Sequence, residues 1–167
     1  IKDGNFDKDD FHTHVQFLKD NIPNRDLKEH QKKAFYHLSS VKNGANFSVP
    51  GSGKTTVVLS VYEKLRLEGK VNTIVVVGPT ACFYPWLEEF RLALGREPDS
   101  KVILSGLNPG VRDFLYTFTP AKAELYLVSF QTLSNDIDNL KELFQNHKVF
   151  FVVLQCLLLP IKRFVFS

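Results

Sequence analysis

The chain of 167 residues contains no methionine and only two cysteines, Cys82 and Cys156. They lack the C-x-x-C spacing of a zinc or redox site and form no disulfide framework, so both are expected to be free thiols in a reducing compartment. No apolar stretch approaches the roughly 20 residues of a membrane helix, and the polar N-terminus is unlike a signal peptide. We therefore predict a protein of the cytoplasm (the bacterial nucleoid) or the nucleus, neither secreted nor bound to a membrane.

An excess of charge of one sign is also missing. The 21 Lys and Arg residues against 18 Asp and Glu residues give a formal net charge of +3. Nucleic-acid-binding chains often show a clear basic patch or tail, so this charge permits such binding without indicating it. The length and the hydrophobic fraction of 44% fit one globular domain. The start at Ile1 and the apolar end at 161–167 indicate a piece of a longer protein.

Helical and strand patterns alternate along the chain. Helices are expected at Phe11–Asn21, Leu27–Leu38, Lys54–Leu67, Leu87–Leu94, Pro109–Tyr116 and Thr132–Asn146. Strands are expected at Ala45–Val49, Asn72–Gly78, Lys101–Leu104, Glu124–Phe130 and Val149–Leu154. Such alternation predicts right-handed crossovers and an α/β fold, in which helices cover both faces of a mostly parallel sheet.

One motif carries chemistry, a glycine-rich loop between an expected strand and an expected helix. Its residues are Pro50, Gly51, Ser52, Gly53, Lys54, Thr55 and Thr56. Backbone N–H groups at such a helix start can hold the phosphates of a nucleotide, and glycines let the backbone approach closely with positive φ. Lys54 is expected to reach the β- and γ-phosphates, and the Thr55 hydroxyl to ligate Mg²⁺. The alternative interpretation is a flexible turn before a helix.

The full P-loop pattern asks for glycine where Ser48 stands, and the shorter form found here is typical of helicase-like ATPases. Together with the segments named below, the chain resembles the first, three-layer RecA-like lobe of a superfamily 2 helicase-related ATPase, and the Swi/Snf-like branch most of all. The resemblance implies ATP as the ligand. It covers residues 27–154, with 1–26 as an N-terminal helical extension and 155–167 as a divergent tail.

Three further segments carry the resemblance. In the family, a glutamine upstream of the P-loop recognises adenine, and Gln31 of the segment 27–31 matches it. An amide can donate to and accept from the adenine edge at once. The segments 75–90, with its Trp-x-x-Glu-Phe helix, and 127–133 resemble strand ends that face DNA. The implied nucleic-acid contacts are Thr80, Ser129, Gln131 and Thr132. For Ser129 and Thr132, a local helix cap is an equally good interpretation.

The resemblance stops after Leu154. The family continues with Asp-Glu-x-His, whose carboxylates complete the Mg²⁺ site and orient the attacking water, but this chain reads Gln155-Cys156-Leu157-Leu158. A shifted reading frame, splice variant or misread sequence would explain this, as would a chain cut at this strand with a foreign tail, or a true non-hydrolysing nucleotide binder. The second RecA-like lobe is also missing. The chain alone is therefore expected to bind ATP weakly and to be inactive.

Three classes of function remain for the P-loop. The first is the motor lobe of an ATP-dependent helicase or translocase acting on nucleic acid, most simply double-stranded DNA, with the motor of a restriction system as a branch that the sequence does not separate. The second is a nucleotide-binding module without hydrolysis. The third, a small-molecule kinase, predicts an arginine-rich lid that the chain does not show. A metal site at His12 and His14 is disfavoured, because side chains two apart on a helix point away from each other.

Overall fold

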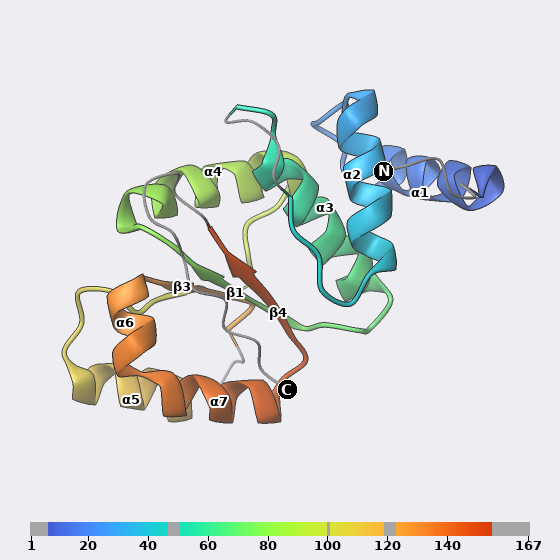
Figure 1. Ribbon diagram of the computed structural model, residues 1–167. Coiled ribbons are helices and arrows are strands. Elements are labelled where there is room, and N and C mark those ends of the chain that lie inside the picture. Colours follow the sequence, from blue (N-terminus) through green and yellow to red (C-terminus); the bar gives the residue numbers. More distant parts are fainter. Residues whose placement is uncertain (1–6, 47–50, 100, 119–122, 155–167) are drawn as a thin grey trace.

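The computed structural model describes residues 7–46, 51–99, 101–118 and 123–154. In chain order the elements are α1 (Lys8–Asn21), α2 (Glu29–Ser40), α3 (Lys54–Leu67), β1 (Thr73–Val77), the one-turn 3₁₀ helix η1 (Thr80–Cys82), α4 (Phe83–Leu94), β2 (Lys101–Ile103), α5 (Pro109–Phe118), β3 (Leu125–Val128), α6 (Phe130–Asn135), α7 (Ile137–Asn146) and β4 (Val149–Val153). Figure 1 shows α3 and α4 on one side of the sheet and α5, α6 and α7 on the other. The predicted α/β fold is confirmed.

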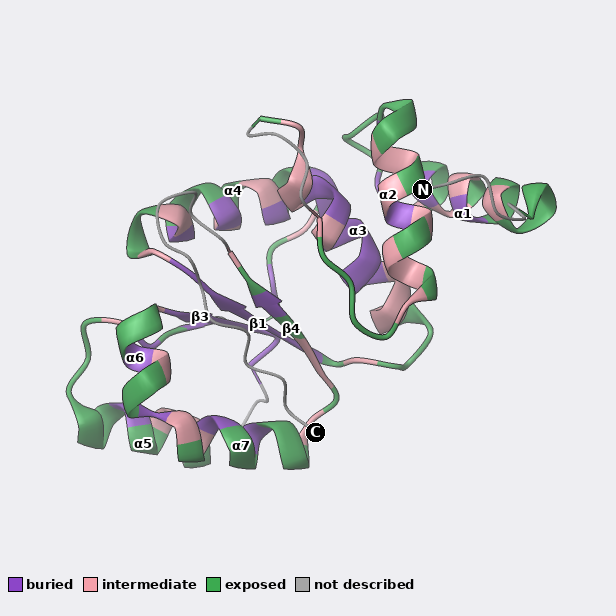
Figure 2. Ribbon diagram, viewed as in Figure 1, coloured by how far each residue is buried: buried purple, intermediate pink, exposed green. Residues whose placement is uncertain are grey.

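The sheet has the order β2-β3-β1-β4, and every pair of neighbouring strands is parallel. Its centre is β1, whose residues Ile74, Val75, Val76 and Val77 are all 0% exposed. Ile74 and Val76 join the core formed with α1 to α4, whereas Val75 and Val77 join the core on the α7 side. Figure 2 shows this burial along the middle of the sheet. A continuous apolar run marks this strand because both of its faces are covered.

The predicted helix over 132–146 is wrong as one element, since the structure divides it into α6 and α7 at Asp136. The Asp136 carboxylate accepts hydrogen bonds of 2.6 and 2.8 Å from the guanidinium of Arg112 on α5, and both side chains are less than a tenth exposed. The backbone of Asp136, with φ −110° and ψ 25°, has left the helical region. A tertiary ion pair therefore fixes the position of the break.

Two other boundaries need comment. The helix expected from Leu87 begins earlier, at Phe83, with Pro85 in its first turn. Proline is tolerated there because the first N–H groups of a helix have no partner within the helix. Of the strand expected at 45–49, Ala45 and Asn46 are not in a strand, and the other three residues lie outside the described part of the chain.

The N-terminal extension packs into the lobe. Leu18 of α1 and Ile22, which follows that helix, lie in the same buried cluster as Phe35 of α2 and Tyr62 of α3. The predicted tail, residues 155–167, lies outside the described residues. Within the ranges given above, none of the helices combines the length and apolar character needed to cross a bilayer.

A buried polar network lies where β3 begins. Glu124 accepts hydrogen bonds from Arg96 at 2.7 and 2.9 Å, from the Tyr62 hydroxyl at 2.9 Å and from the Asp99 backbone N–H at 2.7 Å. Arg96 also pairs with Glu63 of α3 at 3.0 Å. Burial raises the pKa of Glu124, but the hydrogen bonds from Arg96 and Asp99 outweigh it and hold that pKa below its ordinary value. The network joins α3, the residues after α4, and β3.

Candidate nucleotide-binding site

The glycine-rich loop has the backbone conformation that a phosphate cradle needs. Gly51 and Gly53 have φ of 77° and 75°, in the left-handed region that favours glycine. Gly53 is the N-cap of α3, so the loop leads directly into the start of a helix of 14 residues. Among the described residues, no atom outside the glycine and its two chain neighbours lies within 4 Å of a Cβ built on Gly51, so there is open space beside that residue. A loop of this shape at a helix start directs backbone N–H groups and the positive end of the helix dipole toward a bound anion.

The side chains of the motif divide into two groups. Lys54 and Thr55 begin α3 and are half-buried. The hydroxyl of Ser52 is buried and has no hydrogen-bond partner among the described residues, which fits a site that a phosphate completes. The hydroxyl of Thr56 instead donates to Glu89 at 2.6 Å, and Thr56 is only 8% exposed. The predicted contact through Pro50 lies outside the described residues.

Gln31, predicted to recognise adenine, lies against the P-loop, where its amide binds backbone groups. Its Nε2 donates to the carbonyl of Ser52 at 2.9 Å, and its Oε1 accepts from the backbone N–H of Lys28 at 2.7 Å. A Cβ on Gly53 would lie 2.2 Å from Gln31 Nε2, so the glycine is also required for this close approach. Gln31 therefore supports the loop, and its contact with adenine stays a prediction.

Replacement of Gln31 by alanine separates these two roles. Because the amide holds the loop backbone, we expect Gln31→Ala to weaken ATP and GTP equally, by the roughly 0.5–1.5 kcal/mol of a neutral hydrogen bond. Isothermal titration calorimetry with both nucleotides measures this. The matched control is Gln145→Ala, an exposed glutamine on α7. A selective loss of ATP binding would show instead that Gln31 reads adenine.

A second contact to the P-loop helix was not predicted from the sequence. Glu89 of α4 accepts the Thr56 hydrogen bond and also pairs with Arg25, whose Nε and Nη2 lie 3.1 and 2.5 Å from its two carboxylate oxygens. We call this the Arg25–Glu89–Thr56 bridge. Glu89 is the glutamate of the Trp-x-x-Glu-Phe motif, so the signal was present in the sequence. Its partners are 33 and 64 residues away and could not be read from it.

The predicted nucleic-acid contacts lie at adjacent strand ends. Thr80 follows β1 and Ser129 follows β3, and the N–H of Gly78 donates to the carbonyl of Val128 at 3.0 Å. Thr80 and Gln131 are exposed. Ser129 caps α6 through the N–H of Thr132, and the two hydroxyls lie 2.9 Å apart.

Thr132 is only 7% exposed, so its hydroxyl serves this local cap. Thr80 and Gln131 are therefore the members of the predicted set that face solvent. The Ser105 hydroxyl accepts a hydrogen bond from the N–H of Ser129 at 2.8 Å. This link to the end of β2 was not predicted.

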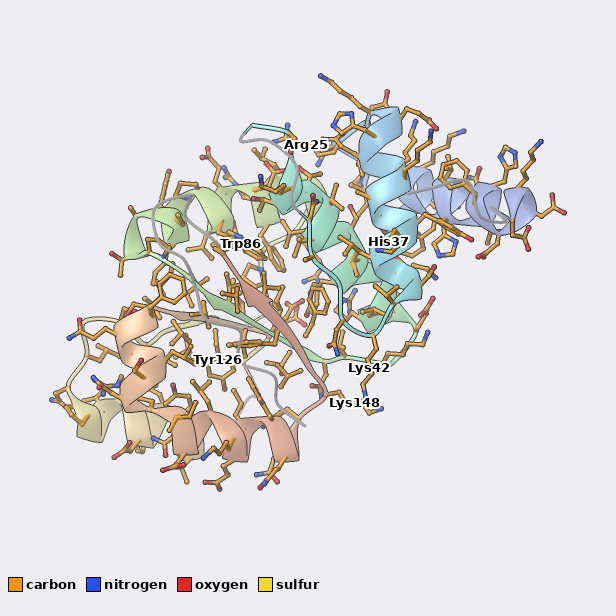
Figure 3. All side chains as sticks on the ribbon, viewed as in Figure 1. Arg25, His37, Lys42, Trp86, Tyr126 and Lys148 are labelled. Carbon is orange, nitrogen blue, oxygen red and sulfur yellow. The ribbon has the colours of Figure 1, made fainter. Side chains whose placement is uncertain are left out.

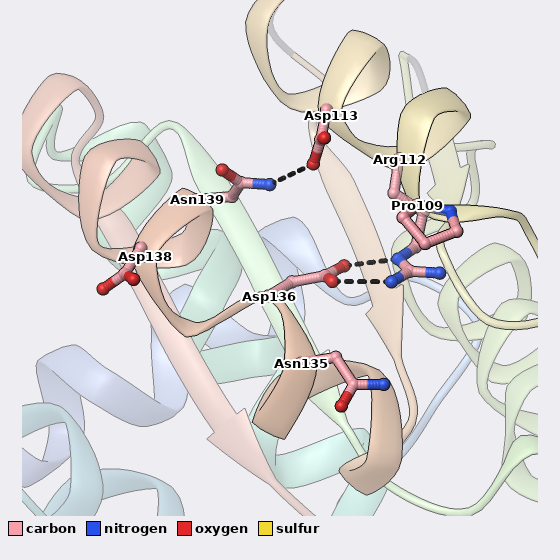
Figure 4. Close-up of a pocket in the computed structure, with 7 residues that line it drawn as sticks. All are labelled: Pro109, Arg112, Asp113, Asn135, Asp136, Asp138 and Asn139. Atoms are coloured by element: carbon pink, nitrogen blue, oxygen red, sulfur yellow. Dashed lines mark hydrogen bonds and ion pairs between the residues drawn. The ribbon is translucent and has the colours of Figure 1, made fainter.

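A hollow of about 400 Å³ lies on the other side of the sheet, between α5 and the start of α7 (Figure 4). Four of its polar groups are paired with one another, Arg112 with Asp136 and Asn139 with Asp113 at 2.7 Å. Paired groups in an open hollow leave little for a ligand, so this is not the nucleotide site.

Few of the described side chains at the P-loop could ligate Mg²⁺. Across the described ranges, no group of three or more His, Cys, Asp or Glu residues could hold a metal ion. Mg²⁺ in nucleotide sites commonly uses one or two protein groups together with phosphate oxygens and water. Thr55 fits that arrangement, and its hydroxyl would hold the ion only together with the phosphates of the nucleotide.

A helicase-like P-loop ATPase has a first lobe with the features found here. They are a glycine-rich loop at a helix start and a parallel sheet with helices on both faces. The chain belongs to the family described as "Type III restriction enzyme, res subunit", whose model matches residues 24–154. The expectation of a RecA-like lobe of a superfamily 2 helicase-related ATPase is thereby confirmed.

Among solved structures, the fold is similar to the Sulfolobus solfataricus SWI2/SNF2 ATPase core in complex with dsDNA, with a TM-score of 0.54 and 15% sequence identity. The match covers 80% of this chain and 32% of that one, so this chain spans about a third of its length. No curated protein sequence matches the chain.

Proposed function

We propose that this chain is the ATP-binding N-terminal lobe of an ATP-dependent translocase or helicase that acts on double-stranded DNA. The observation that carries the proposal is the pair of positive-φ glycines at the start of α3, followed at once by Lys54, in a helicase-related family. In this proposal the loop backbone, Ser52 and Lys54 bind the phosphates, and Thr55 ligates Mg²⁺. A second lobe of the parent protein closes the cleft.

The proposal for DNA rests on the exposed ends of β1 and β3. Thr80 and Gln131 are exposed there and offer a hydroxyl and an amide, groups that bind phosphates without reading sequence. The similar Sulfolobus solfataricus ATPase core was solved in complex with dsDNA. Fluorescence anisotropy with a labelled duplex and with one of its strands tests this. We expect tighter binding of the duplex, and binding of neither would contradict the DNA part of the proposal alone.

The chain itself is expected to bind ATP without turning it over. The sequence after Leu154 offers no carboxylate up to Ser167, so no side chain there can orient the attacking water or complete the Mg²⁺ site. A phosphate-release assay on the purified chain, with and without duplex DNA, should give no rate above that of Lys54→Ala. Strong DNA-stimulated hydrolysis would contradict this expectation.

A second candidate is the motor part of a restriction system, which the family description specifically favours. It shares the lobe and the chemistry, and differs in requiring partner subunits. Reading the gene through codon 155 and beyond tests both motor proposals against a non-hydrolysing module. An Asp-Glu-x-His segment in another frame would support a motor, whereas an intact frame without it would support the module.

A further inference from the structure

The Arg25–Glu89–Thr56 bridge connects three parts of the lobe that have different tasks. Thr56 is in the first turn of α3, two residues after Lys54, and Glu89 is in the middle of α4. Arg25 lies between α1 and α2, six residues before Gln31. The bridge therefore ties the P-loop helix to α4 and to the segment between α1 and α2, where Figure 3 labels Arg25.

The bridge joins a mostly buried carboxylate to an exposed guanidinium, since the Arg25 side chain is 40% exposed. The side chain of Glu89 is 17% exposed and accepts from three donors, at 2.6, 3.1 and 2.5 Å. Exposed ion pairs contribute little, so the part-buried hydrogen bond from the Thr56 hydroxyl to the charged carboxylate is the stronger link of the bridge. Glu89 also holds the pKa of Arg25 above its ordinary value. A displacement of the Thr56 hydroxyl would therefore displace the Glu89 carboxylate that accepts its hydrogen bond.

The helix α4, which contains Glu89, is packed into the core and follows directly on the exposed turn at Thr80. Trp86 and Phe90 anchor α4 in the core, with exposures of 3% and 0%. The helix begins at Phe83, directly after the one-turn helix that carries Thr80. A displacement at Glu89 therefore moves the whole start of α4, because packed helices shift as units and do not bend locally.

We propose that Glu89 is a positioning residue, which transmits occupation of the P-loop through Thr56 to α4 and to the exposed turn at Thr80. The inference rests on the proposed nucleotide-binding function and adds to it a chain of contacts from the P-loop to Thr80. When phosphates bind the loop, the first turn of α3 moves, the Thr56 hydroxyl moves with it, and the carboxylate of Glu89 follows. Arg25 keeps the charge of that carboxylate paired in both positions.

The chain contains its own reporter for this movement. Trp86 is the single tryptophan, and it lies one helical turn before Glu89. Its indole N–H is buried and finds no hydrogen-bond acceptor among the described residues. Its emission should therefore respond to small changes in the packing of α4. The measurement is the change in Trp86 fluorescence on addition of Mg²⁺ and a non-hydrolysable ATP analogue, at a saturation that calorimetry confirms for each variant.

We expect a nucleotide-induced change in wild-type protein and its loss in Glu89→Ala. The matched control is Glu88→Ala, which removes the same charge from the exposed neighbour and should keep the change. Glu89→Gln should also keep it, because an amide oxygen still accepts from Thr56. Thr56→Val should lose it and Thr56→Ser should restore it. This second pair keeps the test valid if Glu89→Ala fails to fold.

The outcomes separate the two proposals. If the analogue binds but Glu89→Ala and Thr56→Val respond as wild type does, or if wild-type emission does not change, the positioning role is overturned and the proposed function stands. If calorimetry detects no binding to the wild-type chain, the proposed function is overturned, and this inference with it.

Discussion

Replacement of Lys54 by alanine should weaken ATP binding by about 1.5–3 kcal/mol, which is roughly 10- to 150-fold in Kd. Lys54 is the first residue of α3 and directly follows the positive-φ Gly53. Its ammonium group makes charge-assisted hydrogen bonds to phosphate oxygens in the proposed site, and the variant removes them. Calorimetric titration of wild type and variant with ATP gives the difference directly.

The control for this experiment is Lys19→Ala, which removes the same charge from an exposed position on α1. It should leave Kd unchanged, because its distance from the loop allows solvent and salt to screen the charge. Urea unfolding of both variants checks that neither loses stability. Equal affinities of Lys54→Ala and wild type would remove the phosphate role from Lys54 and leave the glycine-rich loop as a turn.

The second large effect concerns stability. We expect Glu124→Ala to lower the free energy of unfolding by about 3 kcal/mol, within the range for removing one partner of a buried ion pair. Glu124 is 4% exposed, and its removal leaves Arg96, the Tyr62 hydroxyl and the Asp99 N–H without their acceptor. Arg96 keeps Glu63, which limits the loss. Urea denaturation followed by circular dichroism measures it.

The control is Glu142→Ala, an exposed glutamate on α7 that should change stability by less than about 0.5 kcal/mol. Acid provides a second check. The pKa of Glu124 is lowered in the folded state, so its stabilisation is present above the unfolded pKa and is lost as the pH falls through the folded pKa. Wild-type stability should therefore fall more steeply below about pH 5 than that of Glu124→Ala. Parallel curves would contradict the role assigned to this carboxylate.

The sequence was most informative where local patterns are strong. The bounds of α3 at Lys54 and Leu67 agree with the prediction, because the glycine-rich loop and Gly69 mark both ends. The buried central strand followed from an apolar β-branched run. The predicted helix over 132–146 was wrong, because its periodicity continues through Asp136 and nothing local reveals that Arg112 binds this carboxylate.

The sequence by itself therefore determined the fold class and the place of the P-loop, since helix starts, glycine conformations and covered strands leave local marks. Only the tertiary structure decided how that loop is held. Gln31 reaches it across 21 residues, and Thr56 meets Glu89 across 33. Such partners are set by the packing of α2 and α4 against α3, and side-chain hydrogen bonds between distant elements depend on geometry that no local pattern contains. For the same reason, no local pattern revealed that the hydroxyl of Thr56, a residue of the predicted P-loop, donates to a carboxylate of α4.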